Sequence, residues 1–358
     1  MAGTKSEMTP RERMLTALDR GQPDRVPLDI WATGEVWAKL QAHFGTEDIG
    51  AIKAALHIDG FATVGPAYVG PPIPTHPDGT VENYWGMRSR PVRYATGTYM
   101  EVCYHPLAFA RSVKDLDDYQ WPSPDWFDFS GVRQQCEERR ELPIEAGYSA
   151  PFFFFNNLRG LEQSLVDLAL DPEFSHAVIG RLCDFFYGFC ERLFEAGGGL
   201  IDVTQLTDDF GSQTGLLISL EMFDEFFAPH YRRLARLMRD HGVRIFHHDD
   251  GAMWPLIPRL LDIGVQILNP VQYRCGNIDL GWLKDTYGDR LAFHGGVDNQ
   301  QVLPFGTVEE VRAEVRKCLA TLGRGGGYVL APCHNLQAVT PVENIVAMYE
   351  TAFEEGVY

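Results

Sequence analysis

Short, mostly apolar runs recur along the chain and are the main indication of its architecture. Six of them follow one another from residue 142 onward and are rich in Val, Ile and Leu: LPIEAGY (142–148), GLIDVTQL (199–206), VRIFHHDD (243–250), GVQILNPV (264–271), LAFHGGV (291–297) and YVLAPC (328–333). The N-terminal part supplies two more, VPLDIW (26–31) and GFATVG (60–65). We interpret all eight as β-strands.

Segments with apolar residues at helical spacing lie between most of these strands, for example GLEQSLVDLAL and the run 175–197. Three Thr-x-x-Glu sequences predict capped helix starts, at Thr9, Thr307 and Thr340. Near-continuous apolar strands that alternate with helices are typical of parallel βα units buried on both faces. Eight such units close a barrel, so we expect an α/β fold with a single (β/α)8 TIM-type barrel over residues 1–358.

A doubly wound open sheet is the competing architecture, and it calls for a Gly-rich phosphate turn after its first strand. The chain contains no GxGxxG and no GxxxxGK[ST], and its GRGGGY (323–328) follows a predicted helix, so the pattern favours the barrel. Residues 65–135 are rich in Pro, Gly and aromatic residues. We interpret them as a long N-terminal excursion with a hairpin, inserted over the site.

Composition narrows the classes of partner. The 49 Asp and Glu against 31 Lys and Arg give a net charge of −18, which argues against nucleic acid and anionic membrane surfaces. The seven cysteines are odd in number and include no CxxC pair, as expected of reduced thiols in cytoplasm. The polar start MAGTKSEMTPRER lacks the apolar region of a secretory signal, and no run is long enough for a membrane helix.

Polar side chains gather where five successive strands end. The ends carry Thr207-Asp208-Asp209, His247-His248-Asp249-Asp250, Asn269-Pro270, His294-Gly295-Gly296 and Cys333-His334-Asn335. In a (β/α)8 barrel the chemistry lies at this rim. A single Asp or Asn after a strand is often only the cap of the next helix, but five polar ends together are better explained by a ligand pocket.

Alternation along the strand places His248 and Asp250 on one face and His247 and Asp249 on the other. With Cys333 from a later strand end, His248 and Asp250 supply nitrogen, oxygen and sulfur ligands, a set that suits zinc and leaves a fourth position open. The alternative is that Cys333 is a small buried core thiol.

The chain resembles the uroporphyrinogen decarboxylase superfamily, which includes zinc-dependent, cobalamin-linked methyltransferases. The resemblance rests on the following segments, which together span nearly the whole chain: TPRERMLTALDRGQPDRVP, RGLEQSLVDLALDPEF, DDFGSQTGLLISLEMFDEFFAPHYRRL, HHDDGAMWPLIPRLLDIGVQILNPVQ, FHGGVDNQQVLPFGT and GGGYVLAPCHNLQAVTPVEN. It implies a (β/α)8 barrel.

Two departures refine what the resemblance implies. Porphyrin decarboxylases carry an arginine-bearing segment of the form MRQAGRYLPEY near the first strand, whereas this chain has PLDIWATGEVW there, without arginine. The methyltransferase branch carries an HxC motif and a late Cys; here His248 and Cys333 match two of those positions, and Asp250 replaces the first Cys. A carboxylate makes the site harder, which favours an oxygen or nitrogen leaving group over a thiol.

We therefore expect a cytoplasmic zinc-dependent methyltransferase or demethylase. It moves a methyl group from a small O- or N-methyl substrate to a corrinoid on a partner protein, since the chain has no DxHxxG-type corrinoid motif. His248, Asp250 and Cys333 would hold Zn²⁺, and Asp209 would donate a proton or anchor the substrate. The expected pocket residues are Glu145, Tyr148, Gln205, His247, Asn269 and His294.

Aromatic residues near the expected mouth, at 84–85, 148, 152–155 and 254, suit an apolar or aryl substrate, although a Phe run after a strand is commonly core. Two other hypotheses stay open. One is a metal-independent decarboxylase or lyase of a small carboxylate, in which Asp209 and the histidines manage protons. The other is a catalytically silent partner in a methyl-transfer system. The sequence is also compatible with a homodimer.

Overall fold

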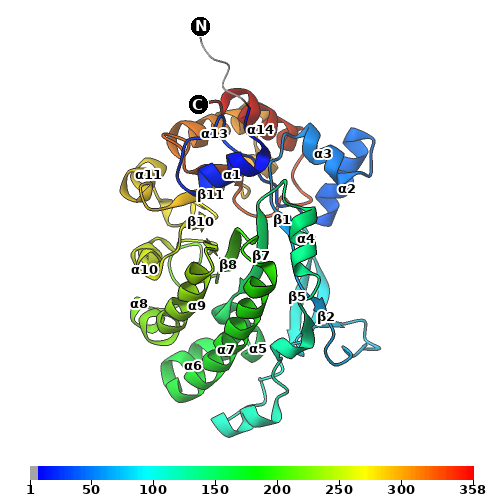
Figure 1. The fold of residues 1–358 in the computed structure, drawn as a ribbon, viewed down its shortest axis with the longest axis vertical. Coiled ribbons are helices and arrows are strands. Elements are labelled where there is room, and N and C mark those ends of the chain that lie inside the picture. Colours follow the sequence, from blue (N-terminus) through cyan, green and yellow to red (C-terminus); the bar gives the residue numbers. More distant parts are fainter. Residues whose placement is uncertain (1–6) are drawn as a thin grey trace.

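Seven parallel strands form one curled sheet in the computed structural model, which describes residues 7–358 (Figure 1). Each strand pairs with its neighbours in the order in which the strands are named here: β1 (Ala62–Thr63), β7 (Ile144–Ser149), β8 (Val203–Leu206), β9 (Arg244–His248), β10 (Ile267–Asn269), β11 (Ala292–Val297) and β12 (Tyr328–Pro332). All seven correspond to predicted strands.

The eighth predicted strand, residues 26–31, closes the sheet into a barrel. Leu28 forms a parallel bridge with Leu330 of β12, and the Leu28 carbonyl accepts hydrogen bonds from the backbone N–H groups of Asp59 and Gly60, just before β1. The bridges are isolated, so this segment is an irregular strand. The predicted (β/α)8 barrel is confirmed.

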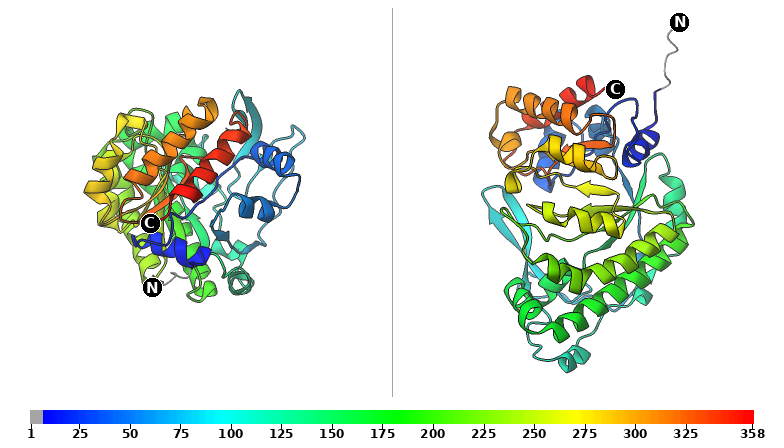
Figure 2. Two further views of the ribbon diagram at one scale, coloured as in Figure 1. Left: turned by 90° about the horizontal axis from the view of Figure 1, so that it is seen from above. Right: turned by 90° about the vertical axis from the view of Figure 1, so that its left-hand side faces the viewer.

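Helices lie outside the strands, as Figure 2 shows from two directions. They belong to the βα units and have the following bounds: α4 (Val132–Glu138), α5 (Pro151–Arg159), α6 (Leu161–Leu170), α7 (Pro172–Gly197), α8 (Leu220–Met222), α9 (Ala228–Asp240), α10 (Ile257–Ile263), α11 (Leu280–Tyr287), α12 (Val302–Phe305), α13 (Val308–Thr321) and α14 (Val342–Glu355). Near the N-terminus, α2 (Gly34–Phe44) and α3 (Ile49–Ala55) follow the first strand.

Helix α1 (Pro10–Leu18) closes the bottom of the barrel. Its buried residues Met14, Ala17 and Leu18 pack in one cluster with inward-facing residues of the strands, including Val203 and Phe246. The predicted capping box at Thr9 is present. Because an apolar plug fills the amino-terminal ends of the strands, the open end of the barrel is the carboxyl-terminal rim.

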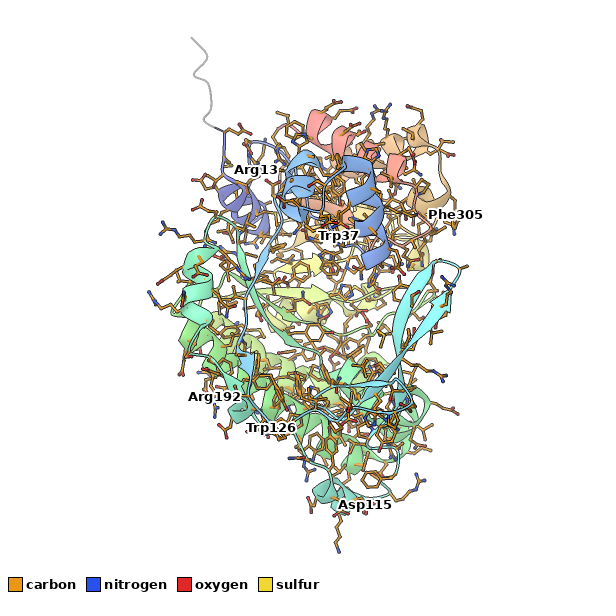
Figure 3. All side chains as sticks on the ribbon, turned by 90° about the vertical axis from the view of Figure 1, so that its right-hand side faces the viewer. Arg13, Trp37, Asp115, Trp126, Arg192 and Phe305 are labelled. Carbon is orange, nitrogen blue, oxygen red and sulfur yellow. The ribbon has the colours of Figure 1, made fainter. Side chains whose placement is uncertain are left out.

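Residues 65–135 contain two small sheets. One pairs β2 (Ala67–Tyr68) with β6 (Phe127–Asp128), and the other is formed by β3 (Val81–Glu82), β4 (Arg88–Tyr94) and β5 (Gly97–Tyr104). The β4–β5 hairpin reaches toward the region of Phe305 (Figure 3). The backbone N–H of Thr98 donates to Glu35 of α2 at 3.0 Å, which fixes the hairpin against the barrel.

Two of the three predicted capping boxes are present, at Thr9 and Thr307. Thr307 caps α13 in a full capping box, but the one expected at Thr340 is wrong, because α14 has Pro341 at its N-cap and no side-chain cap. None of the helices in residues 7–358 combines the length and apolar character needed to cross a membrane. The expectation that no export signal is present rests partly on residues 1–6, which lie outside the described residues.

Candidate functional site

The polar strand ends meet at the carboxyl-terminal rim, as the parallel order of the strands requires. β9 and β10 are in register with His248 opposite Asn269. Beyond β9 the chain turns at Gly251, whose φ of +92° is a left-handed conformation that favours glycine. The turn packs against the loop after β8, where the backbone N–H of Ala252 donates to the Ser212 carbonyl at 2.7 Å. This packing keeps Asp250 beside His248.

Three side chains on the rim are arranged as metal ligands. His248, Asp250 and His334 each offer one ligand atom, and these atoms lie within 4.8 Å of one another. Nε2 of His248 is 3.8 Å from Oδ1 of Asp250, and Nε2 of His334 is 3.6 Å from Oδ2 of Asp250. Two ligand atoms that are each about 2.1 Å from a tetrahedral zinc ion lie about 3.4 Å apart, so small side-chain movements would complete the site.

The environment of Asp250 also suits a cation. Burial raises the pKa of Asp250, and its Oδ1 atom is buried without a hydrogen-bond partner among residues 7–358. A buried carboxylate oxygen without a partner is costly, and a positive charge at that point removes the cost. The residues present therefore fit a divalent metal ion such as zinc.

A chain of hydrogen bonds runs inward from His248. Nδ1 of His248 lies 2.6 Å from Oδ1 of Asn269, and Nδ2 of Asn269 lies 2.6 Å from Nδ1 of His294. Nε2 of His294 lies 3.0 Å from Oδ2 of Asp29, a buried carboxylate. Burial acts to raise the pKa of Asp29, but the hydrogen bond from His294, together with smaller contributions, outweighs it and the pKa is lowered. We call these four side chains the relay.

The relay determines which nitrogen of His248 is free. An ionised Asp29 only accepts, so a neutral His294 donates from Nε2 and accepts at Nδ1. Asn269 must then turn its amide N–H₂ toward His294 and its oxygen toward His248. His248 consequently donates from Nδ1, and Nε2, with its lone pair, lies 3.8 Å from Asp250 and 3.7 Å from Asp209. Such outer partners orient metal-binding histidines in general.

Cys333 does not join this group, contrary to what the sequence led us to expect. Its side chain is 2% exposed, and Sγ donates to the Val271 carbonyl at 3.3 Å. Burial holds the pKa of the thiol well above its usual value, which disfavours the thiolate that binds metal. The adjacent His334 offers the third ligand atom of the cluster instead, because β12 ends at Pro332 and the chain bends at the next two residues.

His247, expected in the pocket, faces away from it. The side chain is fully buried; Nδ1 lies 2.8 Å from the Leu206 carbonyl, and Nε2 lies 3.8 Å from Asp249. Burial lowers the pKa of His247 to about 4, so the ring is neutral near pH 7. The strand alternation described above accounts for this, since His247 and Asp249 share the face opposite His248 and Asp250.

Asp209 lies on the rim with its side chain 46% exposed, and its Oδ1 is 3.7 Å from Nε2 of His248. Glu145 accepts a hydrogen bond from Gln205 at 2.7 Å, and burial raises the pKa of Glu145. Tyr148, 44% exposed, lines the same cavity as these two residues, a crevice of about 290 Å³.

Aromatic side chains form a large part of the wall of this crevice, which we call the aromatic crevice. Tyr84, Phe154, Phe185 and Phe189 line it. Four other aromatic residues expected near the mouth do not line this crevice. Trp85, Phe152 and Phe155 are buried in the core, with exposures of 1% or less, and Phe153 is 39% exposed.

The sequence alone did not identify two parts of the site. In the sequence, His334 is only a neighbour of Cys333, and Asp29 is only one residue of an apolar strand. A carboxylate within the run VPLDIW was the available signal for Asp29, because a charged side chain in a buried strand needs a partner.

The fold and the site together define a (β/α)8-barrel protein with a metal-type cluster at its carboxyl-terminal rim. Comparison with known proteins gives the family. The model of the family "Uroporphyrinogen decarboxylase (URO-D)" matches residues 108–354. That is more than half of the chain, which therefore belongs to this family.

The relatives are named for two different activities, decarboxylation and methyl transfer. The uroporphyrinogen decarboxylase of Solibacter usitatus is 26% identical over 253 residues, 68% of this chain and 69% of the relative. The methylated-thiol–coenzyme M methyltransferase of Methanosarcina mazei is 27% identical over 208 residues, 58% of this chain and 52% of the relative. This chain thus matches only about half the length of the second protein.

Among solved structures, a methyltransferase from Methanosarcina mazei superposes with a TM-score of 0.68. The alignment covers 98% of this chain and 99% of the other, at 20% sequence identity. At this identity the likeness establishes the shared fold.

Proposed function

We propose that this protein transfers a methyl group from a small O- or N-methyl substrate to a corrinoid carried by a partner protein, with zinc held by His248, Asp250 and His334. The observation that carries the proposal is the convergence of these three ligand atoms, with Nε2 of His248 freed for a metal by the relay. The methyltransferase relative and the fold shared with a second methyltransferase support it.

Zinc bound there would act as a Lewis acid on the leaving heteroatom. The chain's own residues do the rest. The relay holds the ring of His248 in place, and Asp250 supplies negative charge. Asp209, 3.7 Å from Nε2 of His248, would anchor the substrate or give a proton to the leaving group. The aromatic crevice would hold an apolar part of the substrate.

The nature of the ligands bears on the substrate. A set of two imidazoles and a carboxylate contains no sulfur and is harder than the thiolate sets of the methyltransferase branch. It therefore favours oxygen or nitrogen as the leaving atom over sulfur. This preference supports a methyl ether or methylamine as the donor.

Decarboxylation of a small carboxylate is the second candidate, because the Solibacter relative is named a uroporphyrinogen decarboxylase. A substrate with many carboxylates needs cationic partners. Among the described residues, no arginine or lysine lines the aromatic crevice, and none lines a second cavity, which has Asp250 and His334 in its wall. Arg25, just before the first strand, binds Asp59 instead. Both observations weigh against a porphyrin substrate.

The test is methylation of cob(I)alamin, followed by its absorbance, with a panel of methoxy-aryl and methylamine donors. We expect transfer with the zinc-loaded protein and its loss in His334→Ala. Absence of transfer from every donor, to free or protein-bound corrinoid, together with release of carbon dioxide from a small carboxylate, would replace this proposal with the decarboxylase. Absence of both activities would favour the silent partner.

A further inference from the structure

A second cavity, separate from the aromatic crevice, opens directly beside the metal-type cluster. It measures about 630 Å³ and is lined by Asp250 and His334, by Thr96 and Tyr99 of the β4–β5 hairpin, and by residues around α12. Figure 3 shows the hairpin reaching toward Phe305, which also lines this cavity. We call it the amide cleft, because six of its lining residues are carboxamides: Gln213, Gln272, Asn299, Gln300, Gln301 and Gln337.

Unmet hydrogen-bonding capacity in the amide cleft indicates a ligand. Oδ1 of Asn299 is buried and has no hydrogen-bond partner in the described part of the chain. Buried polar atoms are nearly always paired in native proteins. A ligand that donates a hydrogen bond into the cleft would satisfy this atom.

Part of the cleft wall is held firmly. Oε1 of Gln272 accepts a hydrogen bond at 2.8 Å from the backbone N–H of Gly251, in the turn that positions Asp250. Asp298, next to Asn299, accepts hydrogen bonds from the backbone N–H groups of Gln300 and Val302 and binds Arg274 at 2.7 Å. The carboxamides of this wall are therefore presented by a backbone that is already fixed.

The charge of the cleft limits the class of ligand. Its described lining includes no lysine or arginine, and its acidic residue is Asp250. The chain as a whole carries a net charge of −18. An anionic ligand would find no lysine or arginine there to pair with, whereas carboxamides both donate and accept and pair well with other uncharged groups of the same kind.

We propose that the amide cleft binds an uncharged, carboxamide-bearing ligand, and that in function it receives the amide side chains on the rim of the corrinoid. The inference that the cleft binds amides is based on its lining residues alone. The identification of the ligand as the corrinoid rests on the proposed function. Because Asp250 and His334 form one wall, a ligand held here lies next to the proposed site of methyl transfer.

The test compares two corrinoids of nearly the same shape by equilibrium dialysis with the full-length protein. Dicyanocobinamide carries amide side chains, and cobyrinic acid carries carboxylates in their place. We expect cobinamide to bind at least about tenfold more tightly. Asn299→Leu and the near-isosteric Gln337→Glu should each weaken cobinamide binding about three- to tenfold, the range expected for one hydrogen bond. Gln134→Leu, at an exposed position of α4, is the matched control and should leave cobinamide binding unchanged.

Equal or tighter binding of cobyrinic acid would overturn the inference, as would unchanged cobinamide binding in both cleft variants with native melting temperatures. A failure of the proposed function can be distinguished from a failure of this inference. If cobinamide binds in the predicted pattern but no donor methylates cob(I)alamin, methyl transfer is wrong and the amide site stands. If transfer occurs while the cleft variants bind cobinamide normally, the corrinoid docks elsewhere and only this inference is lost.

Discussion

The side-chain oxygen of Asn269 lies 2.6 Å from Nδ1 of His248, and this contact determines which nitrogen of His248 faces the rim. The contact is the outer end of the relay, whose inner end is the carboxylate of Asp29. We therefore expect Asp29, although it does not line the metal-type cluster, to affect metal binding through two intervening side chains.

The relay predicts that Asp29→Asn weakens zinc binding about 10- to 100-fold, because loss of an outer-shell partner lets His248 adopt the wrong tautomer. Competition with a chromophoric chelator measures the affinity, and ¹⁵N shifts of labelled histidine report the tautomer directly. Asp208→Asn is the control: Asp208 is a buried carboxylate that accepts from the backbone of Phe152 and Phe153 and lies outside the relay. An equal loss of affinity in both variants would refute the relay.

The cluster predicts different effects for two adjacent residues. His334→Ala should remove most of the bound zinc, because it deletes one of three ligands. Cys333→Ser should leave the zinc content near that of the wild type, because Sγ is buried against the Val271 carbonyl. Elemental analysis after purification without chelator gives both values. Zinc loss in Cys333→Ser but not in His334→Ala would restore the ligand set first expected from the sequence.

The plug formed by α1 predicts a cost for opening a cavity at the bottom of the barrel. Met14 is fully buried, so Met14→Ala should lower the free energy of unfolding by about 2–5 kcal/mol. Met100→Ala is the control, since Met100 is 52% exposed and its loss should change stability by no more than about 0.5 kcal/mol. Urea denaturation measures both. A cost below about 1 kcal/mol for Met14→Ala would mean that α1 does not seal the barrel.

Lys284 predicts a pH dependence of stability. Burial lowers its pKa to about 8, while its ammonium group donates to the Gly326 carbonyl at 2.6 Å. Between pH 8 and the unfolded value near 10.5 the unfolded chain holds the proton and the native chain has released it, so this group makes stability rise with pH across that window.

The measurement is the difference in unfolding free energy between wild type and Lys284→Met at several pH values. That difference should change in the wild type's favour by on the order of 1–3 kcal/mol from pH 8 to pH 10.5. Lys317→Met, on the outer surface of α13, should track the wild type. A difference that stays constant across the window would show that Lys284 is charged in the native protein throughout.

Local sequence rules predicted the strands and the rim because those features depend on neighbouring residues. Alternation along VRIFHHDD correctly separated His248 and Asp250 from His247 and Asp249. The run of apolar segments likewise gave the barrel, including the irregular strand at residues 26–31.

The parts that escaped prediction depend on distant residues. Asp29 and His294 are 265 residues apart in the sequence and meet only because the first and later strands close the barrel. The choice between Cys333 and His334 depends on how the chain turns after Pro332, which no periodic pattern encodes. The amide cleft gathers carboxamides from several loops, and none of them is distinctive alone.

X-ray absorption at the zinc K-edge of the zinc-loaded protein tests the central claim most directly. A site built from His248, Asp250 and His334 predicts a first shell of nitrogen and oxygen atoms at about 2.0–2.2 Å, with imidazole scattering from two rings. The spectrum of Cys333→Ser should be the same. A sulfur shell at about 2.3 Å that disappears in Cys333→Ser would contradict the ligand set derived from the structure.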